Sequence, residues 1–182
     1  MKKTALFLFV IIGTLWLPLS SCKKLKKLLT FNIDNSATFT IPSSYGTGIN
    51  IPLVFNSPNV QSSSSQSFAN NDTRADHVQD VKLSKLDLSI TSPAGKTFSF
   101  LNSIKIYISG DGLPEVLLAY KDNIPNDVGS SISLTTTGEK LDSYIKASSY
   151  NLRYEIVTDE TFTEDINLLA NMVFTVTAKP LK

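Results

Sequence analysis

The sequence NSIKIYISGDGLPEVLLAYK, residues 102–121, decides the fold class. Over residues 104–108, isoleucines alternate with a lysine and a tyrosine, and this two-residue period is typical of a strand with one buried and one exposed face. Gly110-Asp111-Gly112 follows, and Gly and Asp tolerate the positive φ angles of a tight hairpin. Residues 115–120 then form the returning strand. A helix would spread the three isoleucines around its circumference, so the segment predicts an antiparallel hairpin.

The same alternation recurs on both sides of this hairpin. Residues 29–41 carry apolar side chains on odd positions, and residues 150–156 and 166–178 carry them on even positions. Each segment is bounded by turn-forming residues, which is the pattern of short antiparallel strands. A turn at Asp34-Asn35 would fold the first of these segments into a hairpin of its own.

Two further strands depart from simple alternation. Residues 49–55 place Ile49, Ile51, Leu53 and Phe55 on one face, and Pro52 between them predicts an edge strand, because proline donates no hydrogen bond to a ladder. Between residues 81 and 90 the apolar positions change from odd to even. A β-bulge near Ser84-Lys85 would insert the one residue that this change requires.

One short helix interrupts the strands. Thr136 and Glu139 match a capping box, and the apolar residues at 141, 144 and 145 follow helical spacing, which predicts a helix near 139–146. Residues 57–72 are rich in Ser, Asn and Gln and predict a loop. Residues 29–182 therefore read as a single all-β domain, an antiparallel β-sandwich of roughly seven to nine strands with one short helix.

The N-terminal segment has the three parts of a secretory signal peptide. Lys2 and Lys3 supply the positive start, residues 5–17 are almost wholly apolar, and small residues precede Cys22. The apolar run is too short to span a bilayer comfortably as a helix, which takes about 20 residues.

The stretch Leu19-Ser20-Ser21-Cys22 resembles the lipobox of bacterial lipoproteins. This resemblance implies cleavage before Cys22, a diacylglycerol thioether on the Cys22 sulfur and acylation of the new amino group. Each buried CH₂ contributes about 0.8 kcal/mol, so two or three chains anchor a protein stably. We therefore expect a signal peptide at 1–21 and a lipid-anchored, Lys-rich tether at 22–28.

The tether also bears on localisation. Its four lysines favour contact with anionic head groups, although a solvated tether explains them equally well. Some Gram-negative lipoproteins carry an acidic run after the cysteine that directs them to the cell surface, whereas this chain carries lysines there. We expect a cell-envelope location, with the periplasm-facing side of the outer membrane favoured.

Composition excludes several function classes. Cleavage before Cys22 would leave 161 residues with 15 Lys and Arg against 16 Asp and Glu, since Lys2 and Lys3 depart with the leader. This near-neutral charge does not indicate a nucleic-acid partner, whose binders carry basic patches. Cys22 is the only cysteine, so no intrachain disulfide can form.

The residues that could carry chemistry are few. His77, the only histidine, lies beside Asp76, but no Gly-x-Ser-x-Gly elbow presents a serine to it. Zinc needs three or four N or S ligands, which one His and one lipidated Cys cannot provide. We therefore expect no catalytic residues, no cofactor and no metal site.

Two binding alternatives remain open. The loop 122–129 gathers Asp122, Asn123, Asn126 and Asp127, whose oxygens suit calcium, although Asx residues also favour turns for their own hydrogen bonds. Tyr45 and Tyr107 are the best candidates for stacking on a sugar. We expect a non-enzymatic envelope lipoprotein that binds a protein partner or supports envelope assembly. The alternative is a glycan- or lipid-binding module.

Overall fold

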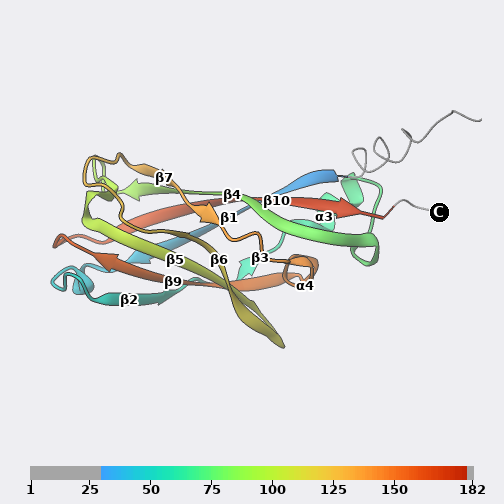
Figure 1. Cartoon of the computed structure of the whole chain (residues 1–182), viewed down its shortest axis with the longest axis horizontal. Coiled ribbons are helices and arrows are strands. Elements are labelled where there is room, and N and C mark those ends of the chain that lie inside the picture. The colour runs from blue at the N-terminus through green and yellow to red at the C-terminus, as the bar shows by residue number, and fades with distance from the viewer. Residues whose placement is uncertain (1–29, 180–182) are drawn as a thin grey trace, which may run out of the picture.

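The computed structural model describes residues 30–179. The predicted signal peptide 1–21, Cys22 and the tether lie outside the described residues. Two antiparallel sheets pack face to face (Figure 1), which confirms the prediction of an all-β sandwich.

The two sheets are formed by ten described strands, three of which contain only two or three residues. The four-stranded sheet has the order β1 (Thr30–Ile41), β10 (Ile166–Ala178), β4 (Val78–Ser92) and β7 (Ser131–Ser133). The six-stranded sheet has the order β2 (Pro52–Asn56), β9 (Ser149–Thr158), β5 (Leu101–Gly110), β6 (Leu113–Lys121) and β8 (Thr135–Thr136), with β3 (Val60–Gln61) also paired to β9.

The core lies between the sheets and follows the predicted alternation. Ile104, Ile106 and Ile108 on β5 are fully buried, and the even-numbered residues of β10 are buried along its whole length. Burial of a large aliphatic side chain contributes about 1.5–3 kcal/mol. The apolar face of these central strands therefore provides much of the stabilisation of the fold.

β1 is one continuous strand, so the predicted hairpin at Asp34-Asn35 is wrong. Its register against β10 runs without a shift from Thr30 to Ile41. Asn35 points into the core, where its Nδ2 donates to the hydroxyl of Tyr150 at 3.0 Å and its Oδ1 accepts from the backbone N–H of Ser63 at 3.2 Å. A buried amide with such partners needs no turn.

The bulge in β4 is confirmed. Leu83 pairs with Phe174 and Lys85 pairs with Val173, which leaves Ser84 as the inserted residue. The Ser84 hydroxyl donates to the backbone carbonyl of Val173 at 2.8 Å. This single insertion moves the apolar side chains of β4 from odd to even positions while they stay on the core side.

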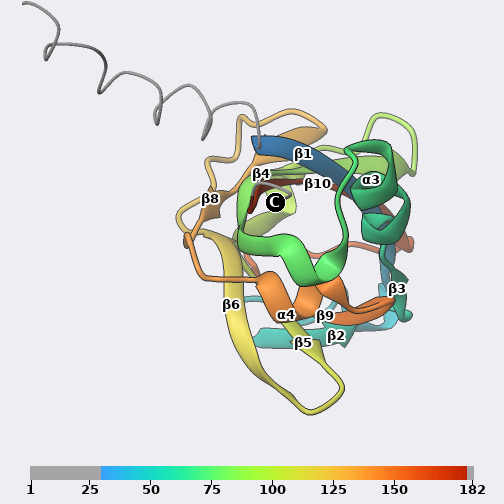
Figure 2. The same cartoon turned by 90° about the vertical axis from the view of Figure 1, so that its right-hand side faces the viewer.

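Two helices and three 3₁₀ turns complete the described chain. α3 (Ser64–Asn70) occupies part of the predicted loop, and α4 (Asp142–Lys146) lies within the predicted helix. Both are seen at the end of the sandwich that faces the viewer in Figure 2. The turns are η1 (Ser43–Tyr45), η2 (Ala75–His77) and η3 (Phe98–Phe100). None of the helices within residues 30–179 is long and apolar enough to cross a membrane.

The predicted capping box is wrong, although the apolar spacing is right. Thr136 belongs to β8, and Leu141 is the N-cap of α4 without a side-chain cap bond. Instead, the Asp142 carboxylate accepts from the backbone N–H of Val81 at 3.0 Å, which ties the helix to β4. Leu141, Tyr144 and Ile145 are buried, so tertiary contacts rather than a local cap fix this helix.

Candidate functional site

The most unusual surface feature is a group of exposed apolar side chains, here called the apolar corner. Its members are Tyr45, Ile49, Ile51 and Val54, which are 45%, 48%, 56% and 51% exposed. These are the strongly exposed large hydrophobic residues within residues 30–179, and they fall within ten positions of one another. Val54 alternates with Leu53 and Phe55 along β2, so it lies on the opposite face of that strand from Phe55, the ring that Tyr45 contacts. The four residues are therefore neighbours in sequence at one margin of the six-stranded sheet, and exposed apolar residues at such a margin can mark an interaction site.

The backbone of the apolar corner is fastened to the rest of the domain at several points. The backbone N–H of Ser43 donates to Asp165 Oδ1 at 2.7 Å, and Gly46 O accepts from Phe162 N at 3.0 Å. Further along, Thr158 Oγ1 donates to Gly48 O at 2.9 Å and Asn50 N donates to Thr158 O at 2.7 Å. The exposed side chains are thus presented on a fixed backbone.

Two local features of the sequence produce this geometry. Gly46 lies so close to the Phe162 backbone carbonyl that a Cβ at position 46 would overlap it. Asn50 has φ +57°, a left-handed conformation that Asn tolerates better than most residues. The hydrogen bond from the N–H of Ser43 lowers the pKa of Asp165 below its ordinary value.

The predicted strand over residues 49–55 is therefore only partly right. β2 begins at Pro52 and lies at the edge of the six-stranded sheet, as the proline indicated. Ile49 and Ile51 precede the strand and face solvent instead of the core. Gly48 and Asn50, both turn-forming residues, were the signal in the sequence that the strand starts late.

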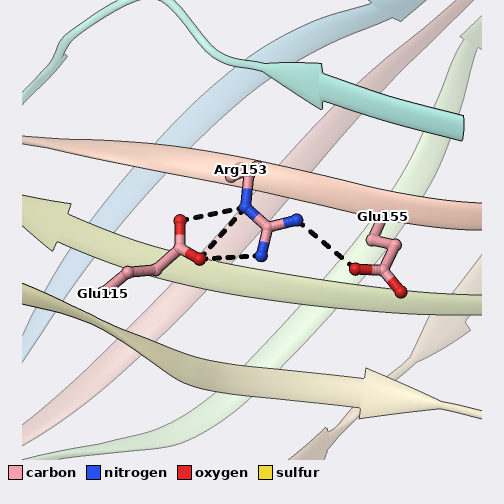
Figure 3. A network of polar contacts seen from close by, with 3 residues as sticks. All are labelled: Glu115, Arg153 and Glu155. Carbon is pink, nitrogen blue, oxygen red and sulfur yellow. Dashed lines mark hydrogen bonds and ion pairs between the residues drawn. The ribbon is translucent and has the colours of Figure 1, made fainter.

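A network of polar side chains lies on the open face of the six-stranded sheet (Figure 3). The Arg153 guanidinium forms a forked pair with Glu115 at 2.7–3.1 Å and contacts Glu155 at 3.4 Å. It also lies over the Tyr107 ring at 4.0 Å from the centroid. The hydrogen bonds that the Arg153 guanidinium donates to the Glu115 carboxylate lower the pKa of Glu115 and raise the pKa of Arg153.

This network joins three neighbouring strands. Glu115 belongs to β6, Tyr107 to β5, and Arg153 to β9. The Arg153 guanidinium already contacts the carboxylates of Glu115 and Glu155 and the Tyr107 ring. We therefore assign the network to sheet pairing rather than to ligand recognition.

The two tyrosines proposed for sugar stacking have separate partners. Tyr45 contacts Phe55 edge to face at 5.2 Å between ring centroids, whereas Tyr107 is covered by Arg153. They do not form a shared stacking platform.

His77 and the candidate calcium loop are placed as follows. His77 lies in η2 with its Nε2 3.7 Å from Asp76, and its side chain is 27% exposed. In the loop 122–129, Asn123 adopts φ +51° and Val128 N donates to Pro125 O at 3.3 Å, as in a turn. Ile124 N donates to Asn102 O of β5 at 2.9 Å, which ties the loop to the sheet. Within residues 30–179, no three His, Cys, Asp or Glu side chains gather closely enough to hold a metal ion.

Comparisons with known proteins give little further information. No protein-family model matches this chain, and no curated protein is significantly similar to it. The chain resembles the crystal structure of FLHE with a TM-score of 0.34 and 10% identity over 82% of this chain and 97% of that chain. It resembles the decameric BFDV capsid protein with a TM-score of 0.38 and 9% identity over 83% and 98% of the two chains. At these values neither likeness carries an argument about function.

Proposed function

We propose that this chain is a cell-envelope lipoprotein, anchored through lipid on Cys22, whose sandwich domain binds a protein partner and carries out no catalysis. The single observation that supports this proposal best is the apolar corner. Four large side chains that are about half exposed and stand on a fixed backbone resemble the apolar centre of a protein interface.

The position of the apolar corner supports a partner away from the anchor. β1 leads from Thr30 to Ile41, and the corner follows directly at the opposite end of the sandwich (Figure 1). Twelve strand residues cover about 40 Å, and the segment from Cys22 to Leu29 reaches at most about 28 Å. With the long axis of the sandwich upright on the membrane, the corner points into the periplasm.

The envelope location rests on the sequence of the leader and tether. The lipobox-like stretch accounts for the anchor, and the lysines that follow Cys22 favour contact with anionic lipid. We propose the periplasm-facing side of the outer membrane. A protein partner is favoured over the alternative of a glycan or lipid ligand, because the exposed residues are mainly aliphatic and about half exposed.

The experiment is site-specific photo-crosslinking in intact cells. A photoreactive residue replaces Ile49 in the full chain, and the matched control places it at Asp127, which is exposed in a polar loop. We expect a discrete crosslinked protein from position 49, weakened by Ile51→Asp, and none from position 127. Equal products at both positions, or none at 49, would contradict the proposed partner site.

The anchor is tested separately through Cys22→Ser. We expect this variant to lose lipidation and normal leader processing, as measured by the mass of the N-terminal peptide from membrane fractions. An unlipidated Cys22 in the mature wild-type protein would overturn the lipoprotein assignment without affecting the crosslinking result.

A further inference from the structure

β1 is an outermost strand that lacks the usual protection against pairing. It is twelve residues long, it contains no Pro, Gly, Lys or Arg, and Asp34 is its one charged residue. By contrast, the outer strand β2 carries Pro52, and the outer strands β7 and β8 are only three and two residues long. Natural sheets usually protect exposed edges with such prolines, charges or short strands.

The backbone groups on the open side of β1 can be assigned from one contact. The carbonyl of Asp34 accepts from Ser63 Oγ at 2.9 Å, so the backbone of Asp34 faces away from β10. Because this orientation repeats every second residue, the N–H and C=O of Ser36, Thr38 and Thr40 face the same way. Within residues 30–179 we find no hydrogen bond to these edge-facing groups.

The open part of this edge has two clear limits. Ser63 covers it at Asp34, and the chain turns into η1 after Pro42. The free stretch therefore runs from Ser36 to Thr40, with Thr38 at its centre.

The surroundings of this stretch define what it can accept. A groove of about 590 Å³ lies beside Thr38 and Thr40, with Asn56 and Pro58 of the segment after β2 on one side and residues of β10 and β4 on the other, and none of its lining residues is charged. A smaller groove separates Ser36 and Thr38 from the segment 58–61, and it also carries no charged side chain. A charged residue on the incoming segment would lose hydration without gaining an ionic partner, so the groove fits a neutral extended strand.

We propose that the open edge of β1 binds the β1 strand of a second copy of this chain. In an antiparallel pair centred on Thr38, the two Thr38 residues lie opposite each other, and Ser36 lies opposite Thr40 of the second copy. Odd positions then face odd positions, so both apolar faces stay on the core side and the two four-stranded sheets become continuous. Such a two-fold contact is self-complementary.

Two features of the chain agree with this register. Asp34 lies opposite Pro42 of the second copy, so no like charges meet, and threonines opposite each other form favourable cross-strand pairs. β1 ends at Ile41 and the chain turns at Pro42, which is where Ser63 of the second copy covers the edge. A contact of this length is small, so the dimer should form at high protein concentration. It requires neither the lipid nor the apolar corner.

Disulfide mapping tests this register in the full chain carrying Cys22→Ser, purified in mild detergent, where any introduced cysteine is the only thiol. Opposite residues in an antiparallel pair lie about 5.5 Å apart, which a disulfide can bridge. We expect Thr38→Cys to give a disulfide-linked dimer on mild oxidation, Thr40→Cys alone to give little, and the double variant Ser36→Cys/Thr40→Cys to restore it. Crosslinking of Thr38→Cys no greater than that of Thr40→Cys would overturn the proposal.

Sedimentation provides an independent measurement. We expect the mass of the Cys22→Ser chain to double as its concentration rises, Thr38→Lys to abolish this change, and Asn32→Lys, on the same exposed face of β1 but outside the free stretch, to retain it. A monomer at all concentrations, or a dimer insensitive to Thr38→Lys, would overturn the proposal. Either result would leave the crosslinking prediction at Ile49 unaffected, so the two proposals fail separately.

Discussion

Two segments of this chain carry isoleucines at alternate positions, but one set is buried and the other is exposed to solvent. Ile104, Ile106 and Ile108 on β5 are fully buried, whereas Ile49 and Ile51 are 48% and 56% exposed. The spacing is the same in both segments, so the two-residue period alone does not decide burial. The comparison shows that the neighbours of a segment determine whether its apolar face is covered.

The neighbours differ in a simple way. β5 has β9 on one side and β6 on the other, and the four-stranded sheet covers its isoleucine face. The segment around Ile49 and Ile51 precedes an edge strand, and the left-handed Asn50 between the two isoleucines breaks the extended conformation. A central strand thus buries its alternate residues, while a segment at the margin can leave them for another molecule.

The largest effect is expected for Ile106→Ala, in the middle of the buried face. Removing three carbons from a fully enclosed side chain should leave a cavity and destabilise the domain by about 2–5 kcal/mol. Urea unfolding of the purified variant, monitored against the unsubstituted chain, gives this free energy.

The matched control for Ile106→Ala is Lys105→Ala, on the other face of β5. We expect the free energy of unfolding to change by no more than about 0.5 kcal/mol. Equal losses at positions 105 and 106 would mean that both faces of β5 are buried, which would contradict the sandwich.

The next effect is expected for Gly46→Ala at the base of the apolar corner. A Cβ at this position would overlap the backbone carbonyl of Phe162, so the segment must shift. Such overpacking costs about 1–3 kcal/mol. Gly129→Ala is the control, because a Cβ there meets nothing within 4 Å. Thermal melts of the two variants that coincide would show that the corner is less firmly fastened than the hydrogen bonds indicate.

The strands were the part of the fold that sequence predicted best. Alternation identified β5, β9 and β10, the change of parity predicted the bulge at Ser84, and Pro52 predicted the edge position of β2. Each of these signals comes from local steric or hydrogen-bonding rules, which act whatever the rest of the chain does.

The errors arose where tertiary contacts outweighed local preference. The serine-rich segment forms α3 because Phe68 is buried and meets Phe31 edge to face, although its composition favours a loop. Asp34-Asn35 remains in β1 because Tyr150 and Ser63 satisfy the buried amide of Asn35. The apolar corner was missed for the same reason, since alternation does not show which face acquires a covering sheet.

A smaller effect concerns pH and the start of the apolar corner. Because the N–H of Ser43 lowers the folded-state pKa of Asp165, its ionised form favours the folded chain. The resulting stabilisation is complete above the ordinary aspartate pKa of 3.8 and is lost as the pH falls through the lower folded-state value. We expect an NMR titration of the Asp165 carboxyl to give a pKa below 3.8, and Asp165→Asn to lose this part of the acid dependence. A pKa at or above 3.8 would contradict the bond.

The smallest effect on stability is expected for Ile51→Ala, and it completes the comparison with Ile106→Ala. Ile51 is 56% exposed and precedes β2, so truncation removes little buried area and leaves no cavity. We expect the free energy of unfolding to change by no more than about 0.5 kcal/mol in the same urea experiment. The crosslinking from position 49 in cells should nevertheless fall, because the exposed isoleucine is proposed to contact the partner. A loss of stability comparable to that of Ile106→Ala would place Ile51 in the core and would remove the basis for an apolar corner.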